Sequence, residues 1–175
     1  GLGDVYKRQG QQRLIAAAAE LVAAGTDVEL LFVGKGRTEA KLRRLAERSV
    51  VNVRFEIDVP WAELAGLYRS MDVFCMPCRS RWGGLEIEGL GLVFLEAAAA
   101  GLPVLAGSSG GSPETVIPGE TGFVVDSVDD IVAGLEILLD NPRRAREMGA
   151  KGRERVVEEY VWDRVVANVR QGFQS

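Results

Sequence analysis

Two glutamates, Glu88 and Glu96, form the residue pair in this chain with the clearest chemical use. Seven residues separate them, and the apolar pattern after Gly91 places Glu88 in a loop and Glu96 about one turn inside a helix. Carboxylates accept hydrogen bonds from hydroxyl groups, so such a pair can hold two sets of sugar hydroxyls. A pair of solvated carboxylates at a helix start is the structural alternative.

Glycines are crowded in the same loop, immediately before the helix that follows Gly91. A glycine-rich approach leaves the first amides of a helix uncovered, and the helix dipole then favours a phosphate or pyrophosphate there. A purely structural turn gives the same glycine pattern. The loop therefore predicts a diphosphate site only in combination with the two glutamates.

Helical and strand patterns alternate along the rest of the chain. Helical spacing is predicted for residues 14–22, 37–48, 60–70 and 93–100, with further helices beginning near 128, 142 and 162. Short apolar strands are predicted at residues 28–33, 51–55, 72–77, 103–106 and 122–125. This alternation predicts an α/β fold with a Rossmann-like, doubly wound parallel sheet, whose ligands bind at the carboxyl ends of the strands.

Further glycine motifs follow the glutamate pair in a fixed order. They are Gly101-Leu102-Pro103-Val104, then the stretch from Gly107 to Glu114, then Gly119-Glu120-Thr121-Gly122. With the two glutamates, the chain resembles the family-four retaining glycosyltransferases of GT-B fold over about residues 10–173. The resemblance implies the C-terminal, nucleotide-sugar-binding half of such an enzyme.

The resemblance also implies residue roles. Glu96 would hold the ribose hydroxyls, and Glu88, the catalytic candidate, a hydroxyl of the transferred sugar. The backbone of Gly89 and the amides of Gly91, Leu92 and Val93 would hold the diphosphate. Gly34 and Gly36 match the family's Gly-x-Gly turn, whose lack of side chains lets the nucleotide approach closely.

The segment from Arg79 to Glu96 is most similar to the actinobacterial phosphatidylinositol mannoside mannosyltransferases. This similarity implies GDP-mannose as donor and a phosphatidylinositol mannoside or similar lipid as acceptor. One departure concerns the base pocket, because those enzymes usually have a glycine where this chain has Ile57. A related enzyme that uses UDP-glucose or another nucleotide sugar is the alternative within the family.

Composition excludes several other function classes. The chain has no histidine, which removes Ser-His and Cys-His nucleophilic pairs and the commonest metal ligand. The net charge of −4 does not indicate nucleic-acid binding. Cys75 and Cys78 have a Cys-x-x-Cys spacing, but no second pair completes a zinc site. We expect neither a metal nor another cofactor, and a cytoplasmic chain, because no apolar run is long enough for a membrane span.

Three segments are predicted. Residues 1–9 resemble a translated sequencing adapter, residues 10–158 form the nucleotide-sugar-binding domain with its first strand truncated, and residues 159–175 form a helix that in the family crosses to the N-terminal domain. The family's diphosphate-binding arginine and lysine would precede Gly10, and Lys7 and Arg8 are not substitutes for them. We expect no unaided transfer by this polypeptide, because the acceptor-binding half, with the family's histidine, lies outside it. The full enzyme would be peripheral to the cytosolic face of the membrane.

Two interpretations of other classes remain. A non-catalytic nucleotide-binding module explains the alternation, although Gly34-Lys35-Gly36 lacks the third glycine of a dinucleotide fingerprint. The second is a purely structural partner domain, which would bind no nucleotide, unlike the glycosyltransferase half and the non-catalytic module.

Overall fold

A computed structural model describes residues 10–36, 38–80, 89–161 and 164 of the 175-residue chain. Its elements in chain order are α2 (Gln11–Ala23), β1 (Glu29–Val33), α3 (Glu39–Glu47), β2 (Asn52–Glu56), α4 (Trp61–Arg69), β3 (Phe74–Met76), α5 (Leu92–Ala99), β4 (Val104–Gly107), the 3-10 turn η2 (Ser112–Thr115), β5 (Gly122–Val125), α6 (Val128–Leu139) and α7 (Pro142–Glu159). The predicted helix starting near Trp162 and the segment 1–9 lie outside the described residues. The predicted alternation of helices and strands is confirmed.

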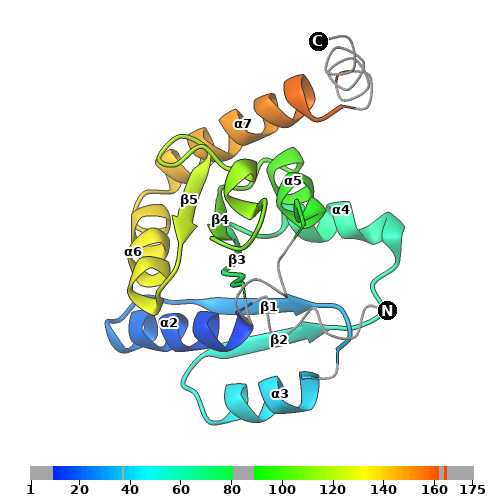
Figure 1. Cartoon of the computed structure of the whole chain (residues 1–175). Helices are drawn as coiled ribbons and strands as arrows, with labels where there is room; N and C mark the ends of the chain where they lie inside the picture. The colour runs from blue at the N-terminus through cyan, green and yellow to red at the C-terminus, as the bar shows by residue number, and fades with distance from the viewer. Residues whose placement is uncertain (1–9, 37, 81–88, 162–163, 165–175) are drawn as a thin grey trace.

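All strand pairs in the described ranges are parallel, as the α/β prediction requires. They form two sheets, β1-β2 and β3-β4-β5, where the sequence pattern predicts one doubly wound sheet. Helices cover both faces of the larger sheet, with α6 on one side of it and α5 on the other (Figure 1). The layer arrangement is therefore that of a doubly wound fold.

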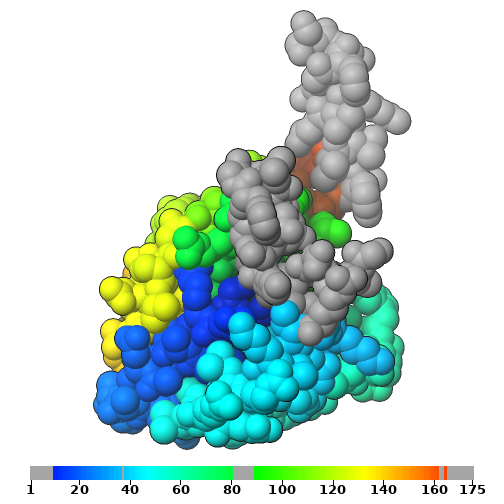
Figure 2. All heavy atoms as spheres, turned by 60° about the horizontal axis from the view of Figure 1, so that its bottom comes forward, coloured from blue at the N-terminus to red at the C-terminus, as the bar shows by residue number. Residues whose placement is uncertain are grey.

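One apolar cluster joins the two sheets. Leu30 of β1, Leu105 of β4 and Val125 of β5 belong to it, together with the buried faces of α2 and α6. The α2 helix supplies a stripe with helical spacing: Leu14, Ile15, Ala17, Ala18 and Leu21. Figure 2 shows α2 between α6 and the α3–β2 region on this face of the molecule.

The second cluster packs α5 on the opposite face of the larger sheet. Phe94 is fully buried there, and its ring meets Phe74 edge to face at a centroid distance of 5.8 Å. Burial of a phenylalanine contributes on the order of 2–3 kcal/mol, so this contact is a firm anchor for a short helix. The packing fixes the position of the α5 start, where the sequence predicts the diphosphate.

The α7 helix packs against the C-terminal end of α5 and very closely against the turn that follows it. A Cβ on Gly149 would lie 1.8 Å from the carbonyl oxygen of Gly101, and one on Gly152 would touch the Ala98 methyl at 3.6 Å. Only a residue without a side chain fits at Gly149. Two helices that are distant in sequence thus brace each other.

Candidate functional site

The α5 helix begins as the sequence predicts for a diphosphate site. Its N-cap, Gly91, has φ 71°, a left-handed conformation that suits glycine, and within the described ranges no side chain caps the helix start. Leu92 is 67% exposed at the first turn, and Val93 follows it partly buried. The backbone amides of this turn are therefore available to an anion, which the helix dipole stabilises.

Glu96 lies one turn farther along α5 and is held by a residue from another helix. The hydroxyl of Tyr68, on α4, donates a hydrogen bond of 3.1 Å to Oε2 of Glu96. Burial and the neighbouring Glu96 charge raise the pKa of Tyr68, so the hydroxyl stays protonated and acts as a donor. The bond orients the carboxylate that the family resemblance assigns to the ribose.

Gly89 is joined to the loop after β4. The Gly111 amide donates a 2.9 Å hydrogen bond to the Gly89 carbonyl, and a Cβ on Gly111 would lie 2.9 Å from that same oxygen. Beside it, the buried Ser112 hydroxyl lies 3.1 Å from Sγ of Cys78. The motif that begins at Gly107 therefore contacts Gly89, at the start of the segment that leads into α5.

Gly34 and Gly36 lie at the carboxyl end of β1, in the smaller sheet. Gly34 has φ 105° and donates a hydrogen bond to the Glu56 carbonyl, which extends the β1–β2 pairing. Lys35, between them, forms a 2.5 Å ion pair with Asp58 in the loop after β2. Among the described residues, the contacts of this turn join it to the β2 loop and not to the Gly89–Glu96 segment.

The loop after β2 explains the departure at Ile57. The left-handed backbone conformation occurs at Asp58, with φ 58°, one residue after the position where the similar enzymes have glycine. Aspartate tolerates this conformation better than a β-branched residue would. In this chain the left-handed position of the turn is therefore residue 58, and Ile57 does not have to adopt it.

Arg13 is a cation at the carboxyl edge of the larger sheet, and the sequence pattern does not identify it. Its guanidinium donates to the Pro77 carbonyl at 3.3 Å and to the Asp126 carbonyl, which follow β3 and β5. Burial, and then the positive charge of Arg79, lower the pKa of Arg13. No sequence spacing pairs residue 13 with residues 77 and 126, so only the fold reveals this position.

The remaining predicted residues give a mixed outcome. Glu88, the catalytic candidate, lies outside the described residues, as do Lys7, Arg8 and Trp162. Burial raises the pKa of the Cys75 thiol to about 12, which makes it a poor nucleophile and metal ligand. No group of three acidic or cysteine side chains in the described ranges is arranged to bind a metal ion.

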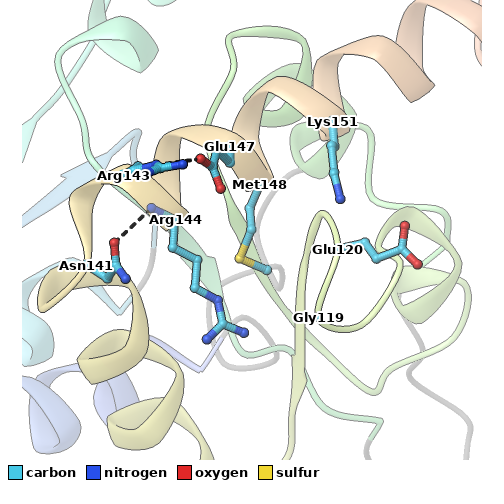
Figure 3. Close-up of a pocket in the computed structure, with 8 residues that line it drawn as sticks. All are labelled: Gly119, Glu120, Asn141, Arg143, Arg144, Glu147, Met148 and Lys151. Carbon is cyan, nitrogen blue, oxygen red and sulfur yellow. Dashed lines mark hydrogen bonds and ion pairs between the residues drawn. The ribbon is translucent and has the colours of Figure 1, made fainter.

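A polar hollow of about 430 Å³ lies away from this site, between α7 and the turn before β5. Figure 3 shows Arg144, Met148 and Lys151 of α7 directed toward that turn, while Arg143 pairs with Glu147. The turn precedes β5, whereas the donor loops follow their strands, so the hollow is at the opposite edge of the sheet. It is not part of the candidate donor site.

The sequence model of the family described as "Glycosyl transferases group 1" matches residues 2–155. The chain belongs to this family. A Corynebacterium glutamicum protein, named as a GDP-mannose-dependent monoacylated alpha-(1-6)-phosphatidylinositol monomannoside mannosyltransferase, is 48% identical over 89% of this chain and 41% of its own length. A Mycolicibacterium smegmatis protein, the GDP-mannose-dependent alpha-(1-6)-phosphatidylinositol monomannoside mannosyltransferase, is 44% identical over 93% of this chain and 46% of its own length. The chain thus spans less than half the length of these family members.

Solved structures confirm the GT-B glycosyltransferase fold. Sucrose-phosphate synthase from Thermosynechococcus elongatus superposes with a TM-score of 0.79 at 30% identity, over 96% of this chain and 42% of that one. The C-terminal domain of the family protein LpcC from Francisella tularensis gives 0.76 at 22% identity, over 91% of this chain and 84% of that domain. None of the helices within the described ranges has the length and apolar character of a membrane span.

Proposed function

We propose that this chain binds the nucleotide-sugar donor of a retaining, GDP-mannose-dependent mannosyltransferase. The observation that carries the proposal is the start of α5, where amides at Gly91–Val93 that no described side chain caps lie one turn before a glutamate oriented by Tyr68. A helix start that can bind an anion lies beside a carboxylate that can accept hydrogen bonds from hydroxyl groups, and this arrangement matches the diphosphate and ribose of a nucleotide. The names of the two bacterial relatives, which specify GDP-mannose and a phosphatidylinositol mannoside, support mannose as the sugar.

The proposed reaction breaks the bond between the mannose anomeric carbon and the β-phosphate oxygen, which departs with the electron pair. The acceptor hydroxyl forms the new bond to that carbon, and its proton passes to the departing phosphate oxygen, leaving GDP. Amides at the α5 start would stabilise the charge on the leaving diphosphate. Glu88 would hold the transferred sugar, and retention of configuration is implied by the family resemblance.

The acceptor and the site of action belong to the proposal for the whole enzyme. The acceptor would be a phosphatidylinositol mannoside or a similar lipid, bound mainly outside the described residues. Such an acceptor places the reaction at a membrane surface, with the donor supplied from the cytoplasm. On the present chain we assign only the donor half of the site.

Calorimetric titration of the chain with GDP, UDP and ADP tests the proposal. We expect selective GDP binding, weakened about tenfold or more in Glu96→Ala, because about 1.4 kcal/mol from lost ribose hydrogen bonds is a factor of ten. Glu63→Ala on α4, an exposed glutamate outside the site, is the control and should bind as the unmodified chain does. Preference for UDP would transfer the proposal to a different donor, and no binding of any nucleotide would refute it.

We also propose that donor binding needs no metal. Helix-start amides and arginines can neutralise a diphosphate without a divalent cation. GDP affinity should therefore be the same in EDTA and in millimolar Mg²⁺, measured by the same titration. A large loss of affinity in EDTA would contradict this expectation.

A further inference from the structure

Arg155, on the last turns of α7, makes more contacts than packing alone requires. Its Nε bonds Oε2 of Glu159 at 2.9 Å, and its Nη2 donates to the Glu114 carbonyl at 3.0 Å and the Tyr160 hydroxyl at 3.1 Å. Tyr160 in turn donates to the same Glu114 carbonyl at 3.2 Å. Two side chains from the end of α7 thus converge on one backbone oxygen of η2.

This oxygen lies in a turn that leads to the donor loop. Glu114 belongs to η2, whose first residue follows Gly111, and its amide donates to the Gly111 carbonyl at 3.1 Å. The Gly111 amide then bonds the Gly89 carbonyl at 2.9 Å. A continuous set of hydrogen bonds therefore runs from Arg155 through η2 to the segment that begins α5.

The same face of α7 approaches α5 directly. Gly149 and Gly152 permit the close contact described above, and Arg155 follows Gly152 by three residues, on the same side of the helix. The donor segment Gly89–Val93 is thereby held at two points, through α5 and through η2. Both points are on α7.

Arg155 lowers stability more than a residue that only fills space would. Its side chain is 18% exposed, and its Nη1 is buried without a hydrogen-bond partner among the described residues. An unsatisfied buried donor lowers stability, so an apolar side chain of similar length would serve packing better. Violations of this rule are expected at functional or strained sites.

We propose that Arg155 is a positioning residue for donor binding, which holds Gly89–Val93 in place through the Glu114 carbonyl and Gly111. This inference rests on the proposed function, because it assigns the diphosphate to that segment. Arg155 itself does not touch the donor.

The test compares Arg155→Met with a matched control on the same helix. Arg143 also pairs with the glutamate four residues later, at 2.8 Å, but its side chain is 86% exposed, so Arg143→Met removes an equivalent ion pair without touching η2. In the full chain without nucleotide, hydrogen exchange of peptides containing residues 89–93 and 109–116 is measured by mass spectrometry. GDP affinity and the thermal unfolding midpoint are measured on the same samples.

We expect Arg155→Met to speed exchange in both segments and to weaken GDP binding, each about tenfold, while Arg143→Met changes neither. Arg155→Lys should fall near the methionine variant, because one ammonium group cannot replace the forked guanidinium. If Arg155→Met does not fold, Tyr160→Phe removes one of the two donors to Glu114 and should shift exchange at 89–93 in the same direction.

Unchanged exchange at 89–93, with faster exchange confined to 109–116 and a lower unfolding midpoint, would reduce Arg155 to a local packing role and overturn the inference. Failure of the unmodified chain to bind GDP would refute the proposed function separately. The exchange comparison would still decide whether Arg155 controls the segment, since it is made without nucleotide.

Discussion

At the scale of single residues, Tyr68 engages one carboxylate oxygen of Glu96, and no other side chain of the described residues is hydrogen-bonded to the second oxygen, which can accept from a ligand. A carboxylate held by a neighbouring donor loses less side-chain entropy when it binds a hydroxyl group. The Tyr68 ring is itself positioned by Phe74, at a centroid distance of 6.0 Å. The orientation of Glu96, the carboxylate proposed to bind the ribose hydroxyls, therefore depends on a residue outside the glycine-rich motif.

Tyr68→Phe tests this dependence, because it removes the hydroxyl and keeps the ring packing. We expect a loss of GDP affinity of about threefold to tenfold, in the range of one neutral-to-charged hydrogen bond. Calorimetry on Tyr68→Phe, Glu96→Ala and the double variant gives the coupling between the two residues. Strictly additive effects in this cycle would show that Tyr68 acts elsewhere.

Asp130 gives a second prediction at this scale, through the start of α6. Its side chain accepts hydrogen bonds from the amides of Ser127 and Asp126, while the Ser127 hydroxyl accepts from the Asp130 amide, a capping box. Hydrogen bonds from Ser127 in particular lower the pKa of Asp130 below its usual value of 3.8. A carboxylate with a lowered pKa stabilises the folded state above the unfolded-state pKa and loses this contribution as the pH falls through the folded-state pKa.

Asp130→Ala should therefore lower the unfolding midpoint at pH 7, and the difference from the unmodified chain should shrink below about pH 4. Urea unfolding at pH 7 and pH 3 provides the measurement. Asp129→Ala, one position earlier in the same turn, is the control and should show a smaller effect at neutral pH. An Asp130 effect that is equal at both pH values would contradict the assigned role of the ionised carboxylate.

At the scale of elements, alanine substitutions at Gly149 and Gly66 distinguish the effect of close packing from the effect of helix propensity. Gly149→Ala would force a methyl group against the Gly101 carbonyl, whereas a methyl group at Gly66, within α4, would extend into open space. We expect the first change to destabilise the chain by about 2 kcal/mol or more and the second to stabilise it by about 0.5–1 kcal/mol. Urea denaturation measures both, and a neutral Gly149→Ala would show that α7 and the turn after α5 can move apart.

The order and type of the elements could be predicted from the sequence, because apolar periodicity and glycine positions are local signals. The helix predicted at residues 93–100 corresponds to α5 (Leu92–Ala99), whereas the left-handed N-cap at Gly91 is not part of the prediction. Contacts that join distant segments could not be predicted in this way. Tyr68 and Glu96 are 28 residues apart, Arg155 and Glu114 41 apart, and neither pair has a spacing that marks it.

At the scale of the whole molecule, the candidate donor site is divided between two sheets. Gly89, Gly91, Leu92, Val93 and Glu96 depend on the larger sheet and its helices, while Gly34 and Gly36 depend on the smaller one. The predicted single sheet would have fixed both parts through one hydrogen-bond ladder. In the described residues, side-chain packing across the shared apolar cluster provides this connection.

The division also matters for how the chain opens. The β1–α3–β2 unit contributes few buried side chains, chiefly Leu30, Leu42 and Val51, whereas the region from β3 to α7 is stabilised by two clusters and by the close packing of α7 on α5 and the turn after it. Regions with fewer buried contacts form separate cooperative units that unfold at lower free energy. Gly34 and Gly36 would then belong to a cooperative unit that is less stable than the unit containing Glu96. A bound nucleotide that contacts both units would raise the free energy of opening of the less stable unit toward that of the more stable one.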